Sequence, residues 1–258
     1  MGLLVGLGPA SAIGGGGSSQ QHGQSVFDLT FVEMTAKGKV TDTYIAEFPD
    51  VDTSMITDFS SFFKSCHMLE YVPNLKTSKS QLFDYMFYGC LKLKEVPLID
   101  TSNATGMTAT FYNCAAIKAI PQLDTRKVTS ISQMCYGCTS LESVPALDFS
   151  EVRSGSNAFS GCTNLKSIGP LSVGLMTSAS SMFRNCYALE NCLLIGLRTG
   201  ISFEFSSKLT KESVLYIFEN AKTVTASQTI TLHADVFGQL SEDEIAIATE
   251  KGFSVVSA

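Results

Sequence analysis

The sequence has 258 residues, of which 45% are hydrophobic and 16% are charged, so the chain has enough apolar residues for a packed core and is no disordered polyelectrolyte. Its net charge is −6, with 18 Lys and Arg residues against 24 Asp and Glu residues, and an acidic chain lacks the basic surface that binds nucleic acid. No apolar run reaches the roughly 18 residues that span a membrane, which argues against membrane insertion.

Residues 1–24 are predicted to form a flexible tether. Gly14 to Gly17 make a run of glycines that Ser and Gln residues follow, a composition typical of flexible linkers. The segment before this run has no Lys or Arg, and Gly and Pro residues break its apolar stretch. We therefore expect no secretory signal there. Residues 25–48 contain short apolar segments, which predict a β-hairpin that forms an N-terminal β cap.

Residues 49–197 are dominated by a repeat of 24 residues. Six of the eight cysteines follow one another at this interval. They are Cys66, Cys90, Cys114, Cys138, Cys162 and Cys186. Disulfide scaffolds and metal sites do not space their cysteines at one constant interval, whereas a repeat protein does. We call the residues at equivalent positions of successive repeats a column.

Other columns keep the same interval. The residue three before each of these cysteines is Phe in all repeats except one, where it is Cys135. The columns three, six and nine residues after the cysteine are aliphatic, apart from Cys192. A proline column comprises Pro49, Pro73, Pro97, Pro121 and Pro145, and it slips by one residue to Pro170. One unit cannot bury its apolar face alone, so neighbouring units must stack into a continuous core.

Each unit is expected to contain one short strand and one return segment. The strands are predicted at positions such as residues 93–99 and 141–147. Apolar residues at three- and four-residue intervals, for example Phe83, Met86 and Phe87, predict a single helical turn in the return segment.

The periodicity stops after residue 197, and residues 198–258 are predicted to form an α/β module. Thr210 is expected to begin a helix of about ten residues, and residues 229–232 and 253–256 to form strands. Ser241 to Glu244 make a capping box that opens a second helix. The expected buried face of the first helix comprises Val214, Leu215, Ile217 and Phe218. This module would close the open end of the repeat array.

The repeats resemble a known family. Residues 158–168, Ala-Phe-Ser-Gly-Cys-Thr-Asn-Leu-Lys-Ser-Ile, resemble the A-F-x-x-C-x-x-L-x-x-I core of BspA-like leucine-rich repeats. Asp-Thr-Ser-x-x-Thr-x-Met at residues 100–107 is similar to the related Mycoplasma-type surface-lipoprotein repeat. The resemblance covers residues 42–197 and departs from the pattern at Lys76, Ser172 and Leu193. The expected fold class is an α/β repeat: a leucine-rich-repeat solenoid of about six 24-residue units with an N-terminal β cap and a C-terminal α/β cap.

Metal and catalytic sites are not expected. Cys135 and Cys138 make half of a zinc motif, but both lie in apolar columns, so we expect buried free thiols. An aspartate column comprises Asp52, Asp100, Asp124 and Asp148. It would suit either a calcium ladder or turn capping, and turn capping is favoured because only one carboxylate recurs per unit. No nucleophile, His and acid fall into a catalytic pattern, so neither an enzyme nor a cofactor is predicted.

A ligand-binding surface is predicted in the column two residues before each cysteine. This column comprises Lys64, Tyr88, Tyr112, Tyr136, Ser160 and Arg184. It follows a buried Phe, so its side chains should point outward. The three tyrosines, flanked by Lys64 and Arg184, would make an aromatic strip on which sugar rings can stack. The alternative is a ladder of tyrosines that only covers the backbone.

The family resemblance implies an extracellular protein attached to a bacterial surface or a phage particle. The predicted function is non-enzymatic adhesion or receptor binding, in which the repeat surface binds a protein or glycan of a host cell. The alternative is an architectural protein whose repeats mediate self-association or attachment within a larger particle. In either case residues 1–24 are expected to connect the chain to a virion or to further copies.

Overall fold

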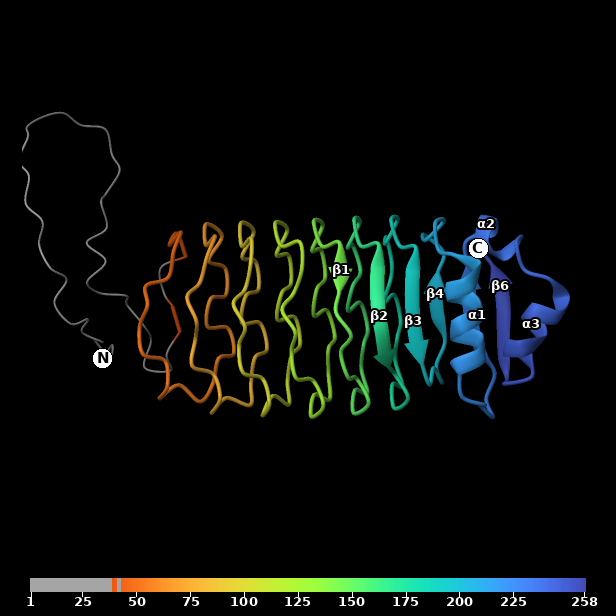
Figure 1. Ribbon diagram of the computed structural model, residues 1–258, viewed down its shortest axis with the longest axis horizontal. Coiled ribbons are helices and arrows are strands. Elements are labelled where there is room, and N and C mark those ends of the chain that lie inside the picture. Colours follow the sequence, from red (N-terminus) through yellow and green to blue (C-terminus); the bar gives the residue numbers. More distant parts are fainter. Residues whose placement is uncertain (1–38, 41–42) are drawn as a thin grey trace, which may run out of the picture.

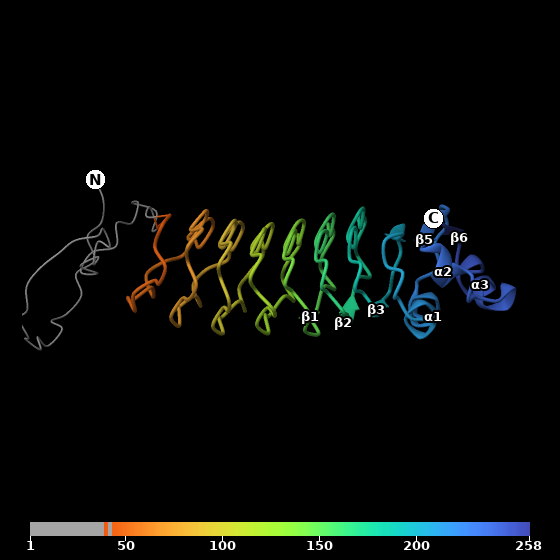
Figure 2. The same ribbon diagram turned by 90° about the horizontal axis from the view of Figure 1, so that it is seen from above.

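The computed structural model describes residues 39–40 and 43–258. The chain winds in similar coils that lie side by side along one axis, with the helices gathered at the C-terminal end (Figure 1). The view from above shows the same single row of coils (Figure 2). The predicted tether and residues 25–38 of the predicted β cap lie outside the described residues.

Successive coils are joined through their backbones at an interval of 24 residues. Parallel bridges link Leu82 to Gly106, Gly106 to Ser130, and Ser130 to Ser154. On the opposite side of the coil, the amide of Lys94 donates to the carbonyl of Glu70 (3.1 Å). Strands β1 (Ser143–Val144), β2 (Ser167–Ser172) and β3 (Asn191–Ile195) form a parallel sheet in the order β1-β2-β3.

The strands are shorter than the sequence predicts, and the proline column explains why. Residues 93–99 form no strand, and of residues 141–147 only the two residues of β1 do so. Proline has no N–H to donate to a ladder. In the described part of the chain no backbone hydrogen bond joins residues 97–99 to residues 121–123. In β2 the proline lies one position later, and pairing with β3 resumes after a bulge between Ile168 and Leu171.

The predicted helical turn of the return segment is wrong. Between Phe83 and Cys90 the backbone makes consecutive turns in which N–H groups alternate between two partners. The amide of Met86 donates to Phe83 in its own coil (3.2 Å), whereas that of Phe87 donates to Thr110 in the next coil (2.8 Å). Tyr85 has a φ of 60°, which a right-handed helix excludes. Bonds to the next coil thus replace the i to i−4 bonds of a helix, and the described repeats are helix-free.

The core consists of the predicted apolar columns. Phe63, Phe87 and Phe111 stack with ring centroids 5.4 and 5.6 Å apart. All eight cysteines are buried and free, so the predicted burial is confirmed. The thiol of Cys90 donates to the carbonyl of Phe63 in the preceding coil (3.1 Å), and each later cysteine of the column, as far as Cys186, makes the same bond. A small apolar side chain with a donor therefore fits this column better than alanine.

The C-terminal region contains the expected elements and two that were not expected. Helix α1 (Lys211–Asn220) begins after Thr210, and α3 (Glu242–Thr249) has both bonds of the predicted capping box. The expected strands are β5 (Gln228–Leu232) and β6 (Phe253–Ser257). These four predictions are confirmed. Strand β4 (Ile201–Phe203) and the short helix α2 (Ala234–Phe237) were not expected. The parallel order is β4-β5-β6.

Strand β4 belongs to a shortened coil that the sequence periodicity conceals. The ring of Phe203 stacks on that of Phe183 (5.3 Å), and the hydroxyl of Ser206 donates to the carbonyl of Cys186 (3.2 Å). The amide of Thr210 donates to Glu190 (2.9 Å), as the amide of Lys94 does to Glu70. This coil is therefore 20 residues long. Phe203 takes the position of Phe183, Ser206 that of Cys186, and Thr210 that of Glu190.

We predict that alkaline pH destabilises the protein through its buried thiols. Burial raises the pKa of the Cys186 thiol from 9.0 to about 12, so the unfolded chain loses this proton first as the pH rises. Between pH 9 and 12 the thiol should cost about 1.4 kcal/mol of unfolding free energy for each pH unit. Urea unfolding at pH 8, 9, 10 and 11 measures this slope. The unfolding free energy of C186A should fall less steeply with pH by that amount. An equal slope in the wild type and in C186A would contradict the prediction.

Candidate functional site

A trough crosses the coils at the corner that follows the proline column. Its volume is about 910 Å³, and it is lined by residues 75–79, 98–102, 122–126, 146 and 148 together with Ser54. Its floor consists of nearly buried aliphatic and threonine side chains. These are Leu75, Ile99 and Leu123 with Thr77, Thr101 and Thr125. The trough lies next to the proline column, where no backbone hydrogen bond joins residues 97–99 to residues 121–123 among the described residues.

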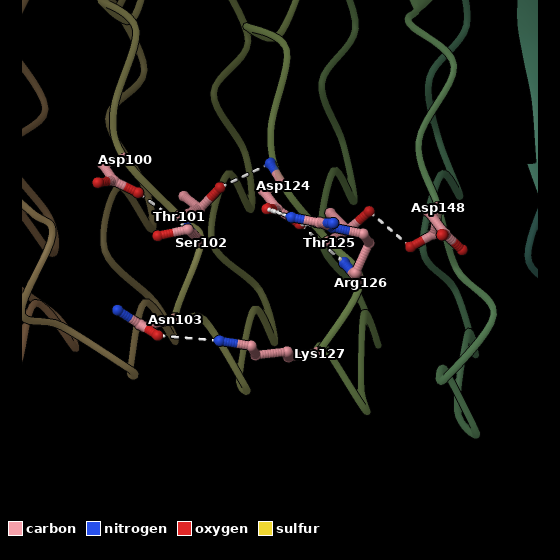
Figure 3. Close-up of polar contacts among 9 residues, drawn as sticks. All are labelled: Asp100, Thr101, Ser102, Asn103, Asp124, Thr125, Arg126, Lys127 and Asp148. Carbon is pink, nitrogen blue, oxygen red and sulfur yellow. Dashed lines mark hydrogen bonds and ion pairs between the residues drawn. The ribbon is translucent and has the colours of Figure 1, made fainter.

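Aspartate side chains shape one rim of the trough, next to the threonines of its floor (Figure 3). Asp100 Oδ1 accepts from the amide of Ser102 (3.0 Å), and Asp148 Oδ1 accepts from that of Ser150 (2.9 Å). These bonds form turns within one coil, as the turn-capping interpretation predicts. Among the described residues no group of three or more His, Cys, Asp or Glu side chains is placed to hold a metal ion.

The threonines of the floor join each coil to the next. Thr101 Oγ1 accepts from the amide of Asp124 (2.8 Å), and Thr125 Oγ1 donates to the carbonyl of Asp148 (2.6 Å). Because both hydroxyls are buried and used in this way, they hold the rim in register and leave recognition to the exposed side chains.

The charges of the trough balance one another. Its lining contains Lys76, Lys79 and Arg126 and the carboxylates of Asp100, Asp124 and Asp148. Arg126 donates to both oxygens of Asp124, at 3.0 and 2.6 Å. These side-chain hydrogen bonds hold the pKa of Asp124 below its usual value. The pKa of Asp100 is also lowered, in its case by the hydrogen bonds from Ser102. Both carboxylates are therefore charged acceptors at neutral pH.

The predicted tyrosine column forms a closed stack. The rings of Tyr88 and Tyr112 lie 4.4 Å apart at 10°, and those of Tyr112 and Tyr136 lie 4.7 Å apart at 7°. Lys64 Nζ is 5.3 Å from the ring centroid of Tyr88. Arg184 lies two coils beyond Tyr136, with the buried Ser160 between them. The structure thus brings Lys64 and the three tyrosines together and leaves Arg184 apart.

The stacking changes what the tyrosines can offer to a ligand. Both faces of the Tyr112 ring are covered by its neighbours, and burial beside these rings raises the pKa of its hydroxyl. The expectation that sugar rings stack on open ring faces is therefore corrected for Tyr112, because the stack presents ring edges and hydroxyl groups instead.

Sequence reasoning missed two exposed groups near these surfaces. Tyr85 is 37% exposed and lies beside Lys64, whose Nζ is 5.3 Å from its ring, yet its column carries no aromatic residue elsewhere. Leu98 is 71% exposed at the trough. Prolines at a constant interval predict an interrupted ladder, and that signal could have located the trough.

Comparison with known proteins gives the family. Six copies of the BspA type leucine rich repeat region match residues 59–190 and 150–241. The chain belongs to the BspA-type leucine-rich-repeat family. Proteins of this family are generally non-enzymatic, their repeats typically mediate protein binding, and they are often surface-associated. Among the described residues no helix is long and apolar enough to cross a membrane.

Two solved structures are similar to this BspA-type repeat chain. A leucine-rich-repeat protein of T. pallidum is 16% identical with a TM-score of 0.48, covering 88% of this chain and 92% of its own. A leucine-rich-repeat protein of Bacteroides ovatus is 15% identical with a TM-score of 0.23, covering 82% and 83%. No curated protein matches the sequence.

We predict that T101V lowers the unfolding free energy by about 1–3 kcal/mol, because the substitution leaves the amide of Asp124 without its acceptor. The matched control is T129V, since Thr129 is exposed and its hydroxyl bond to Thr105 is long (3.3 Å). The control should change stability by less than about 0.5 kcal/mol. Urea unfolding measures both variants, and equal losses would show that the buried threonines do not hold the rim.

Proposed function

We propose that this BspA-type repeat protein is a non-enzymatic adhesion or receptor-binding protein of a bacterial surface or a phage particle. Its repeat surface would bind a protein or glycan of a host cell. The observation that carries this proposal is the trough, which is lined by residues of five successive coils and has a side-chain rim held in register by the buried threonines. A rigid, extended surface of this kind is what repeat proteins use for binding.

We also propose the domain division expected from the sequence: a tether (1–24), a β cap (25–48), a solenoid (49–197) and an α/β capping module (198–258). In this division the shortened coil at Phe203 is the first part of the capping module. Support for the last two comes from the contact between them. Helix α1 follows directly on the shortened coil, and Ser213 in α1 accepts from the amide of Cys192 in β3 (3.2 Å). The module would thus cover backbone groups that an open end exposes.

The tyrosine stack is proposed as a second contact region, through its hydroxyl groups and ring edges. We predict that replacing Tyr88, Tyr112 and Tyr136 together by Phe reduces attachment of the labelled protein to host cells at least fivefold. The rings still stack in this variant, so its melting temperature should stay within about 2 °C of the wild type. Y187F removes an exposed hydroxyl outside the stack and is the matched control.

The same assay distinguishes the alternatives. Unchanged attachment of the triple variant would remove the tyrosines from the binding surface and leave the proposed function standing. A wild-type protein that attaches to no cell but forms defined multimers by size exclusion with light scattering would contradict the proposed function and favour the architectural alternative.

A further inference from the structure

We propose that the trough binds a neutral, extended glycan lengthwise, with successive sugar residues lying over successive coils. This inference rests on the proposed function, because it assigns a ligand class to the surface that carries that function. Three properties of the trough support it: its charge balance, its repeat distance and the groups on its rim and floor.

The charge balance favours a neutral ligand. Three cationic and three carboxylate side chains line the trough. One cation and one carboxylate are already paired, because Arg126 donates hydrogen bonds to both oxygens of Asp124. Lys76 is paired as well, with Asp52 at the outer edge (3.1 Å). An acidic polysaccharide would face Asp100 and Asp148, which have no ion-pair partner among the described residues.

The repeat distance favours a glycan over an extended peptide. Where the coils pair through their backbones they lie about 4.8 Å apart. Equivalent side chains of successive coils repeat at 4.4 and 4.7 Å in the tyrosine stack and at 5.4 and 5.6 Å in the stack of Phe63, Phe87 and Phe111. An extended peptide advances about 3.3 Å per residue, so its side chains would fall out of step with the coils. A pyranose ring linked across its length is about as long as the coil spacing. Each sugar would therefore lie over one coil.

The groups that line the trough suit a sugar. Leu98, 71% exposed, offers an apolar contact to the C–H face of a ring. Beside it Asp100 offers a charged acceptor and Ser102 a hydroxyl, and Gln122 lies in the next coil. Sugar hydroxyls, which both donate and accept, can use all of these groups.

Direct binding of defined oligosaccharides tests the inference. The probes are neutral β-linked oligosaccharides of glucose, xylose, mannose and N-acetylglucosamine, each from two to six residues long, titrated into the full chain and followed by ligand-observed NMR. At least one series should bind with an affinity that rises tenfold or more from the disaccharide to the pentasaccharide, and little beyond it, because five coils line the trough.

Two variants place the site, and a third is their control. L98R should weaken binding of the pentasaccharide at least tenfold. D100N should also weaken it, while Asn keeps the turn that Asp100 caps. L91R is the matched control, because Leu91 is an exposed leucine of the same coil (45%) that does not line the trough. Binding by L91R should equal that of the wild type.

Several results would overturn the inference. These are the absence of binding to every neutral series, preference for heparin fragments or for extended peptides, and equal binding by L98R and L91R. Cell attachment measured in parallel separates this failure from that of the proposed function. If no neutral oligosaccharide binds but the wild-type protein still attaches to cells, the glycan inference fails and the adhesion function remains.

Discussion

The structure depends on backbone hydrogen bonds that leave each coil for the next. In the return segment every second amide donates to the neighbouring coil, as Phe87 does to Thr110 (2.8 Å) and Phe111 to Met134 (2.8 Å). This alternation requires positive φ at regular positions, including Ala109 at 53°. The local cost, of the order of 1–2 kcal/mol per residue, is offset because each coil satisfies the groups of its neighbours. The cysteine thiols add a side-chain bond in the same direction.

The apolar columns and the terminal helices were predictable, because burial and capping leave direct marks in the sequence. The phenylalanine and cysteine columns, Thr210 and the capping box at Ser241 all lie where expected. One of the two left-handed columns was not predictable, since residues such as Ala109 and Gln133 occupy it without a glycine signal. The other column, directly before the repeat cysteine, carries such a signal in Gly89, Gly137 and Gly161. The shortened coil at Phe203 was missed because four residues are absent and Ser206 stands where a cysteine would be.

The candidate site likewise has features that the sequence predicts and one that it does not. The turn role of the aspartates followed from their chemistry, and the stacking of the tyrosines followed from one of the two interpretations of their column. The trough was not predicted: the proline column is visible in the sequence, but its effect appears only in the bonds that are missing between adjacent coils. The same repeat thus packs the core and, next to the proline column, leaves adjacent coils without backbone hydrogen bonds. There Leu98 is exposed although Ile99 beside it is buried.

The most direct test is native-state hydrogen exchange of single amides. The account predicts the strongest protection, close to the global unfolding free energy, for the amides of Phe87, Phe111 and Cys135, which donate to the next coil. The amides of Ile99 and Leu123, which lie in equally well buried residues but have no backbone partner among the described residues, should exchange at least a hundredfold faster. Equal protection of the two sets would contradict the claim that the ladder between the coils is continuous on one side and open at the trough.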